Sequence, residues 1–98
     1  MYTILRSDVF AEWLDDLADE RAKARISVRL ISADKGNFGD CAPVGDGISK
    51  MRVHFGPSYR LYFTRRGKVI HLLLCGGDKS SQKRDIKRAK ALLAALKE

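Results

Sequence analysis

The segment from residue 48 to residue 63, ISKMRVHFGPSYRLYF, constrains the fold most, because polar and apolar side chains alternate on both sides of a Gly-Pro-Ser turn. Successive side chains of a β-strand point to opposite faces. The apolar face would consist of Met51, Val53, Phe55, Leu61 and Phe63. The polar face would consist of Lys50, Arg52, His54, Arg60 and Tyr62. The pattern predicts two antiparallel strands with core on one side and a row of cations on the other.

Length and composition limit the class of protein. The 98 residues, 45% of them apolar, predict one domain over residues 1–98. The net charge of +7 favours a polyanion or an acidic protein as partner. Cys41 and Cys75 belong to no CxxC or nearby histidine pattern, so we expect a reduced compartment, no metal site and no cofactor. No apolar run approaches the ~20 residues of a membrane span, so we expect a soluble, cytoplasmic protein.

The first third of the chain predicts one strand and two helices. Residues 1–5 have the composition of a strand, and Ser7 or Asp8 offers a helix N-cap. Apolar side chains three and four residues apart then form one stripe at Phe10, Trp13, Leu14 and Leu17, and a second at Ala22, Ile26, Leu30 and Ala33. We expect a helical hairpin.

The rest of the chain predicts a loop, a buried strand and a last helix. Residues 35–47, with four glycines and a proline, predict a loop attached to the core by Phe38 and Val44. A turn over residues 64–68 precedes an apolar run at 69–75, which is typical of a central strand covered on both sides. The sequence GGDKSS should end that strand. The last helix would bury Ile86, Ala89, Leu93 and Leu96.

These elements predict an α+β fold. It has an N-terminal strand, a helical hairpin, a three-stranded antiparallel meander that completes a small twisted sheet, and a C-terminal helix.

The row of cations suits a phosphodiester, because guanidinium and ammonium groups neutralise phosphate and stabilise the charge of its transition state. An ordinary solvated sheet face is the alternative. Cations on adjacent strands with no acid among them repel one another unless an anion is present. His54 is the only ordinary proton-transfer group of the row, and the neighbouring cations favour the role of base. A strand-end histidine bonded to the backbone is the alternative for His54.

Other polar residues have two interpretations each. Tyr62 would stack on a nucleobase or simply cover the sheet, whereas Tyr59 and His71 fit the core. The GGDKSS turn leads into a helix N-terminus, where amides and Lys79 would hold an anion, or where Asp78 would only cap the helix. A P-loop is excluded, because GxxxxGK[ST] is absent.

Three blocks carry a resemblance that runs nearly end to end: GNFGD followed by PVGDGIS, then MRVHFGPSYRLYFTRRG, then LLLCGGDKSSQKRDIKRAKAL. With them, the chain resembles the RelE/ParE toxin superfamily, and within it the addiction-module killer proteins related to HigB and RelE. Members are toxins of type II toxin-antitoxin pairs, and the RelE-like branch cuts mRNA in the ribosomal A site. The resemblance therefore implies an endoribonuclease that inhibits translation.

The implied reaction is attack of a ribose 2′-hydroxyl on the adjacent phosphate, leaving a 2′,3′-cyclic phosphate and a 5′-hydroxyl. The resemblance implies that four cations orient the scissile phosphate and stabilise its charge: Lys50, Arg52, Arg60 and Lys79. His54 or Lys50 would be the base. Further RNA contacts are expected from Tyr62, Arg65, Lys83 and Arg84. A tyrosine on the C-terminal segment of RelE has no counterpart here, where Asp85 lies nearby, so no general acid is assigned.

The implied partners are a cognate antitoxin with a helix-turn-helix domain, and the ribosome with its mRNA. Operator DNA would be bound only through the antitoxin, and no membrane is expected. Two alternatives stay open. A ParE-like inhibitor of DNA gyrase shares the fold and needs no RNA-cutting residues. A non-catalytic toxin would bind nucleic acid through the basic face without cutting it.

Overall fold

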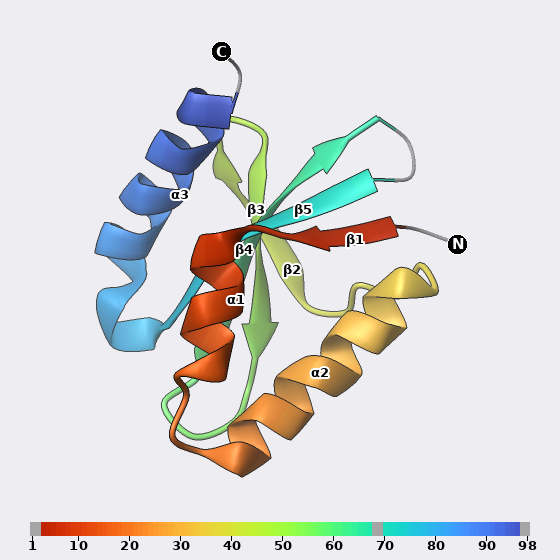
Figure 1. Cartoon of the computed structure of the whole chain (residues 1–98), viewed down its shortest axis with the longest axis vertical. Coiled ribbons are helices and arrows are strands. Elements are labelled where there is room, and N and C mark those ends of the chain that lie inside the picture. Colours follow the sequence, from red (N-terminus) through yellow and green to blue (C-terminus); the bar gives the residue numbers. More distant parts are fainter. Residues whose placement is uncertain (1–2, 68–69, 97–98) are drawn as a thin grey trace.

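The computed structural model describes residues 3–67 and 70–96, and in them a mixed sheet of five strands lies between helices (Figure 1). The strands are β1 (Thr3–Arg6), β2 (Cys41–Gly45), β3 (Ile48–Val53), β4 (Tyr59–Arg66) and β5 (Ile70–Asp78). The helices are α1 (Asp8–Asp15), α2 (Glu20–Asp34) and α3 (Gln82–Leu96), with a 3₁₀ turn, η1 (Lys79–Ser81), before α3. The predicted α+β class is confirmed.

The order of strands in the sheet is β1-β5-β4-β3-β2. The edge strand β1 runs parallel to β5, and the other neighbours are antiparallel. The predicted central strand is confirmed, because β5 lies between β1 and β4. Parts of the predicted elements lie outside the described residues, namely Met1, Tyr2, Lys68, Val69, Lys97 and Glu98.

The predicted loop over residues 35–47 is wrong in its second half, because β2 forms there and pairs with β3. The antiparallel meander therefore has four strands, β2 to β5, and not three. A two-residue turn joins β2 to β3, with φ of 55° at Asp46 and 78° at Gly47. Two left-handed residues in a row are what a tight hairpin with right-handed twist requires. Pro43 is tolerated because β2 is an edge strand.

The central strand does end within GGDKSS, as predicted, but only after β5 has continued through Gly76 and Gly77 to Asp78. These glycines are needed for close packing. A Cβ atom at Gly76 would overlap the ring of Trp13 from α1, and one at Gly77 would overlap the carboxylate of Asp85 from α3. The chain turns only after Asp78, whose Oδ1 accepts from the amides of Ser80 and Ser81 at 2.9 and 3.3 Å. The predicted capping role of Asp78 is confirmed.

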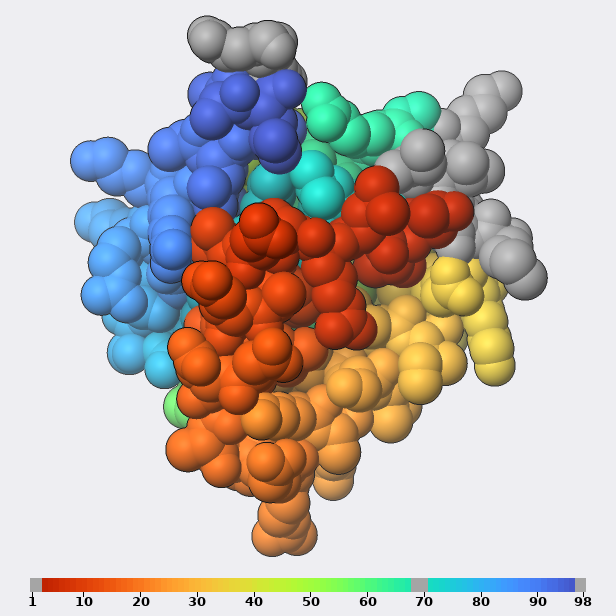
Figure 2. Space-filling view, in the orientation of Figure 1, coloured from red at the N-terminus to blue at the C-terminus, as the bar shows by residue number. Residues whose placement is uncertain are grey.

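The sheet separates two apolar cores. Helices α1 and α2 cover one face, where Phe10 and Ile26 meet the predicted apolar row of Met51, Val53, Leu61 and Phe63. Helix α3 covers part of the other face, where Ala89 and Leu93 pack over Ile48, Tyr62, Leu74 and Cys75. Figure 2 shows α1 and α2 over much of the facing side, with α3 along its edge. None of the described helices has the length and apolarity needed to cross a bilayer.

Predicted contacts of the core are confirmed at three places. Phe38 stacks on Phe63 with ring centroids 5.5 Å apart. His71 is buried beside Phe38, with ring centroids 4.5 Å apart, and its pKa is lowered by burial. Val44 packs against the core under α3. Ser7, not Asp8, caps α1, because its hydroxyl accepts from the amide of Phe10 at 3.0 Å.

Replacement of Gly77 by Ala should lower the free energy of unfolding by about 1–3 kcal/mol, because the new methyl group overlaps the Asp85 carboxylate. When Gly77→Ala is combined with Asp85→Ala, the loss should be smaller than the sum of the two single losses. Urea denaturation of the four proteins measures this coupling. Gly67→Ala is the control: its φ is 70° and nothing lies within 4 Å of the Cβ position, so it should not couple to Asp85→Ala. Additive losses at Gly77 and Asp85 would contradict the packing.

Candidate functional site

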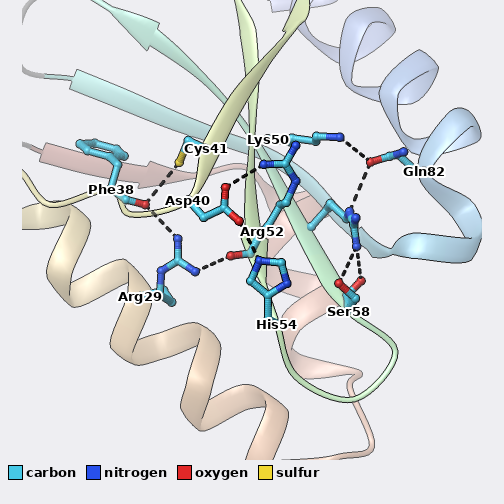
Figure 3. A network of polar contacts seen from close by, with 10 residues as sticks. Arg29, Phe38, Asp40, Cys41, Lys50, Arg52, His54, Ser58 and Gln82 are labelled. Carbon is cyan, nitrogen blue, oxygen red and sulfur yellow. Dashed lines mark hydrogen bonds and ion pairs between the residues drawn. The ribbon is translucent and has the colours of Figure 1, made fainter.

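The predicted cationic row lies on the face of the sheet that α3 covers only in part. Lys50 and Arg52 come from β3, and Arg60 comes from β4. Arg52 and Arg60 are direct partners in the register of the two strands, so two guanidinium groups belong to neighbouring positions of one face. Like charges at directly opposed positions destabilise a sheet. The structure compensates these charges with groups from three other segments (Figure 3).

Asp40 is the anion of the site. Its Oδ1 lies 2.7 Å from Arg52 Nη1, and its Oδ2 lies 2.7 Å from His54 Nε2. The backbone places it there, because the Arg52 amide donates to the Asp40 carbonyl at 2.9 Å and so extends the β2–β3 ladder by one residue. Hydrogen bonds from His54 and Arg52 hold the pKa of Asp40 below its ordinary value of 3.8. The carboxylate is therefore ionised at neutral pH.

His54 lies just past the end of β3, and its side chain is 66% exposed. One prediction was that His54 forms a hydrogen bond to the backbone. For its Nε2 atom this is wrong, because Nε2 lies 2.7 Å from the Asp40 carboxylate. An exposed imidazole next to a carboxylate and a guanidinium group can exchange a proton with a bound molecule.

Gln82 and Ser58 accept hydrogen bonds from the other two cations of the face, Lys50 and Arg60. The side-chain carbonyl of Gln82, the first residue of α3, accepts from Lys50 Nζ at 2.8 Å and from Arg60 Nε at 3.3 Å. Arg60 Nη1 also donates to the carbonyl and hydroxyl of Ser58, at 2.9 and 2.7 Å. Ser58 has a φ of 66°, an uncommon backbone conformation that the buried Arg60 side chain stabilises. Burial, and then the charges of Arg52 and Arg60, lower the pKa of Lys50.

Helix α2 holds the loop that carries Asp40. The guanidinium group of Arg29 donates to the carbonyl of Phe38 at 2.9 Å and also to the carbonyl of Arg52. Gly39 passes close to this side chain: its φ is 66°, and a Cβ atom there would lie 2.8 Å from Arg29 Nη2. The loop and β3 are thus both joined to the half-buried side chain of Arg29, which holds Asp40 beside Arg52.

The structure decides between the two interpretations of Tyr62, stacking on a nucleobase and covering the sheet. Its side chain does fall on the same face as Lys50, but it is 0% exposed and belongs to the core under α3. Burial raises the pKa of Tyr62 to about 12. A ring in this position cannot stack on a nucleobase. The other interpretation, that Tyr62 covers the sheet, is confirmed.

The remaining predicted site residues do not join the cationic face. Lys79 is exposed at the start of η1, and within residues 3–67 and 70–96 no hydrogen bond or ion pair connects it to the face. Arg65 lies five positions along β4 from Arg60, roughly 16 Å away at the rise of a strand. Lys83 and Arg84 are exposed beside Gln82 in the first turn of α3. RNA contacts by these four residues stay predictions.

The predicted anion site at the GGDKSS turn is occupied by the protein itself, because the Asp78 carboxylate accepts from the two amides there. Among the described residues, no three His, Cys, Asp or Glu side chains lie close enough together to hold a metal ion.

Three residues of the site were not predicted from the sequence, namely Asp40, Gln82 and Ser58. Asp40 had only part of a signal: Asp46-Gly47 is a strong hairpin turn, but counting back from it places Cys41 opposite Arg52, and the bulge between Pro43 and Gly45 is what shifts Asp40 into that position. The interpretation of residues 35–47 as a loop hid that register. Gln82 and Ser58 had no comparable signal, because their contacts depend on where α3 docks and how the β3–β4 turn is bent.

Arg52→Gln and His54→Gln should each raise the pKa of Asp40 toward 3.8, because each removes a donor to its carboxylate. Acid titration followed by carbon-13 NMR of the carboxyl group measures the change. Since the pKa of Asp40 is lowered in the fold, its contacts stabilise the fold above pH ~4 and are lost as the pH falls through the folded value. The control is Arg21→Gln, an exposed change in the first turn of α2. An Asp40 pKa unchanged in both site variants would contradict the geometry.

No family model matches this chain. The chain is similar to an uncharacterized protein of Haemophilus influenzae, to which it is 47% identical over 87 residues, an alignment that covers 89% of this chain and 88% of the relative.

Proposed function

We propose that this chain, which belongs to the same family as the Haemophilus influenzae protein, is a RelE-like toxin of a type II toxin-antitoxin pair that cuts mRNA on the ribosome. The observation that carries the proposal is the facing pair of Arg52 and Arg60, with Lys50 beside them and His54 at the rim. Three cations with one carboxylate leave an excess of positive charge where a phosphate can bind. The resemblance of the three sequence blocks to killer proteins supports mRNA as the substrate.

In the proposed reaction, the 2′-oxygen of a ribose forms a bond to the adjacent phosphorus, and the bond from phosphorus to the 5′-oxygen breaks. Arg52 would bind the non-bridging oxygens, whose negative charge grows in the transition state, and the neighbouring Arg60, which is only 7% exposed, would add its positive charge. Arg60 is suited to this role because Ser58 and Gln82 fix its guanidinium group in advance. A fixed donor needs no reorganisation when the charge develops.

The two proton transfers divide between His54 and Lys50. His54 would take the proton from the 2′-hydroxyl. A base needs the lone pair of Nζ, whereas Nζ of Lys50 presents an N–H to the Gln82 carbonyl, so we assign Lys50 the role of acid. Because burial and two arginines lower its pKa, Lys50 can instead give a proton to the leaving 5′-oxygen. This assignment fills the role for which the sequence offered no residue.

The proposed setting follows from the same resemblance. The toxin would act in the cytoplasm, would be neutralised by an antitoxin with a helix-turn-helix domain, and would meet operator DNA only through that antitoxin. The excess of cations on the chain suits both the ribosome and an acidic partner.

Brief induction in a bacterial host, followed by primer extension on abundant mRNAs, tests the nuclease. The wild type and the control Arg21→Ala should give breaks in phase with codons. Arg52→Ala should reduce them about 10²–10³-fold, because it removes one stabiliser of the transition-state charge. Circular dichroism of the purified proteins should show the same fold in all three.

Other outcomes would overturn the proposal in distinct ways. Intact mRNA together with double-strand DNA breaks would indicate a ParE-like gyrase inhibitor. Arrested growth with intact mRNA and intact DNA would indicate a toxin that binds without cutting.

A further inference from the structure

We propose that Asp40 is a positioning residue: it holds the imidazole of His54 with the proton on Nε2, and it neutralises Arg52 until a substrate phosphate takes its place. The first part concerns this chain's own geometry. The catalytic consequence rests on the proposed function.

The contact between Asp40 and His54 fixes the tautomer. An ionised carboxylate only accepts hydrogen bonds, so at 2.7 Å from Asp40 Oδ2 the Nε2 atom of His54 must carry the proton. The lowered pKa of Asp40 keeps the carboxylate ionised at neutral pH. In a neutral imidazole, the nitrogen without a proton is then Nδ1. Nδ1 is therefore the atom that can accept the proton of the 2′-hydroxyl.

Asp40 is itself well fixed, which a positioning role requires. Its second oxygen accepts from Arg52 Nη1 at 2.7 Å, and its carbonyl accepts from the Arg52 amide at 2.9 Å. Arg29 holds the loop just before it through the Phe38 carbonyl. His54, by contrast, is exposed and past the end of its strand, so the carboxylate is the group that limits rotation of the ring.

The same carboxylate lies where an anionic substrate would contact Arg52. Asp40 is 44% exposed and is not part of either core, so a phosphate can displace it from Arg52 without disturbing the sheet. Loss of the Asp40 charge should then tighten the binding of RNA. Loss of the contact that orients His54 should slow the transfer of the 2′-hydroxyl proton to its imidazole. Opposite effects on binding and rate separate a positioning role from general damage to the site.

The test compares the wild type with Asp40→Ala, and with Asp34→Ala as a control that removes an exposed acid at the end of α2. Nitrogen-15 NMR, recorded at a pH where the ring is neutral, reports the tautomer of His54. In this neutral form the wild type and the control should carry the proton on Nε2, whereas Asp40→Ala should show the mixture that free histidine has in water. Affinity for a short single-stranded RNA should rise about two- to fivefold in Asp40→Ala only.

Cleavage of mRNA on programmed ribosomes completes the test. Asp40→Ala should lower kcat about 10- to 100-fold and should lower KM as well. Asp40→Asn, which keeps the shape and removes the charge, should show the same rise in affinity and serves if the alanine variant does not fold.

An unchanged tautomer in Asp40→Ala would overturn the inference, whatever the enzyme does. A raised KM, or an unchanged affinity for RNA, would overturn the part that concerns Arg52. If the wild type itself cuts no RNA, the proposed function fails, and the NMR result still decides whether Asp40 orients His54.

Discussion

Two arginines that face each other across β3 and β4 impose the main constraint on this structure. Their repulsion would destabilise the middle of the sheet unless other groups compensated it. The compensating groups come from three separate segments: Asp40 from the loop before β2, Ser58 from the β3–β4 turn, and Gln82 from the start of α3. Each of these segments is therefore held to the same small region of the sheet.

The compensating groups differ in charge, and this difference decides what the site can bind. Gln82 and Ser58 are neutral, so they orient Lys50 and Arg60 without cancelling their charge. Within residues 3–67 and 70–96, only the Asp40 carboxylate forms an ion pair with a cation of the face, and Asp40 is exposed whereas Ser58 and Gln82 are half-buried. An incoming anion can thus compete for Arg52 while Arg60 stays in its prepared geometry.

Helix α3 divides the polar face of the sheet into a buried part and an open part. Ala89 and Leu93 cover Tyr62, which becomes core, whereas Arg52 and His54 stay accessible. Lys50 lies where Gln82, the first residue of α3, meets the strands, and burial there lowers its pKa. Close approach of helices to β5 is possible because Gly76 and Gly77 have no side chains.

The sequence by itself determined the features that depend on neighbours in the chain. The alternation along residues 48–63 predicted which side chains share a face, and the stripes of apolar residues predicted the helices, because both patterns express the local period of one element. Only the tertiary structure decided which polar positions are exposed and which acceptor each cation meets. Tyr62 is buried because α3 docks on it, and Asp40 reaches Arg52 because the β2–β3 register places it there. Such contacts join segments far apart in the sequence, so no local pattern records them.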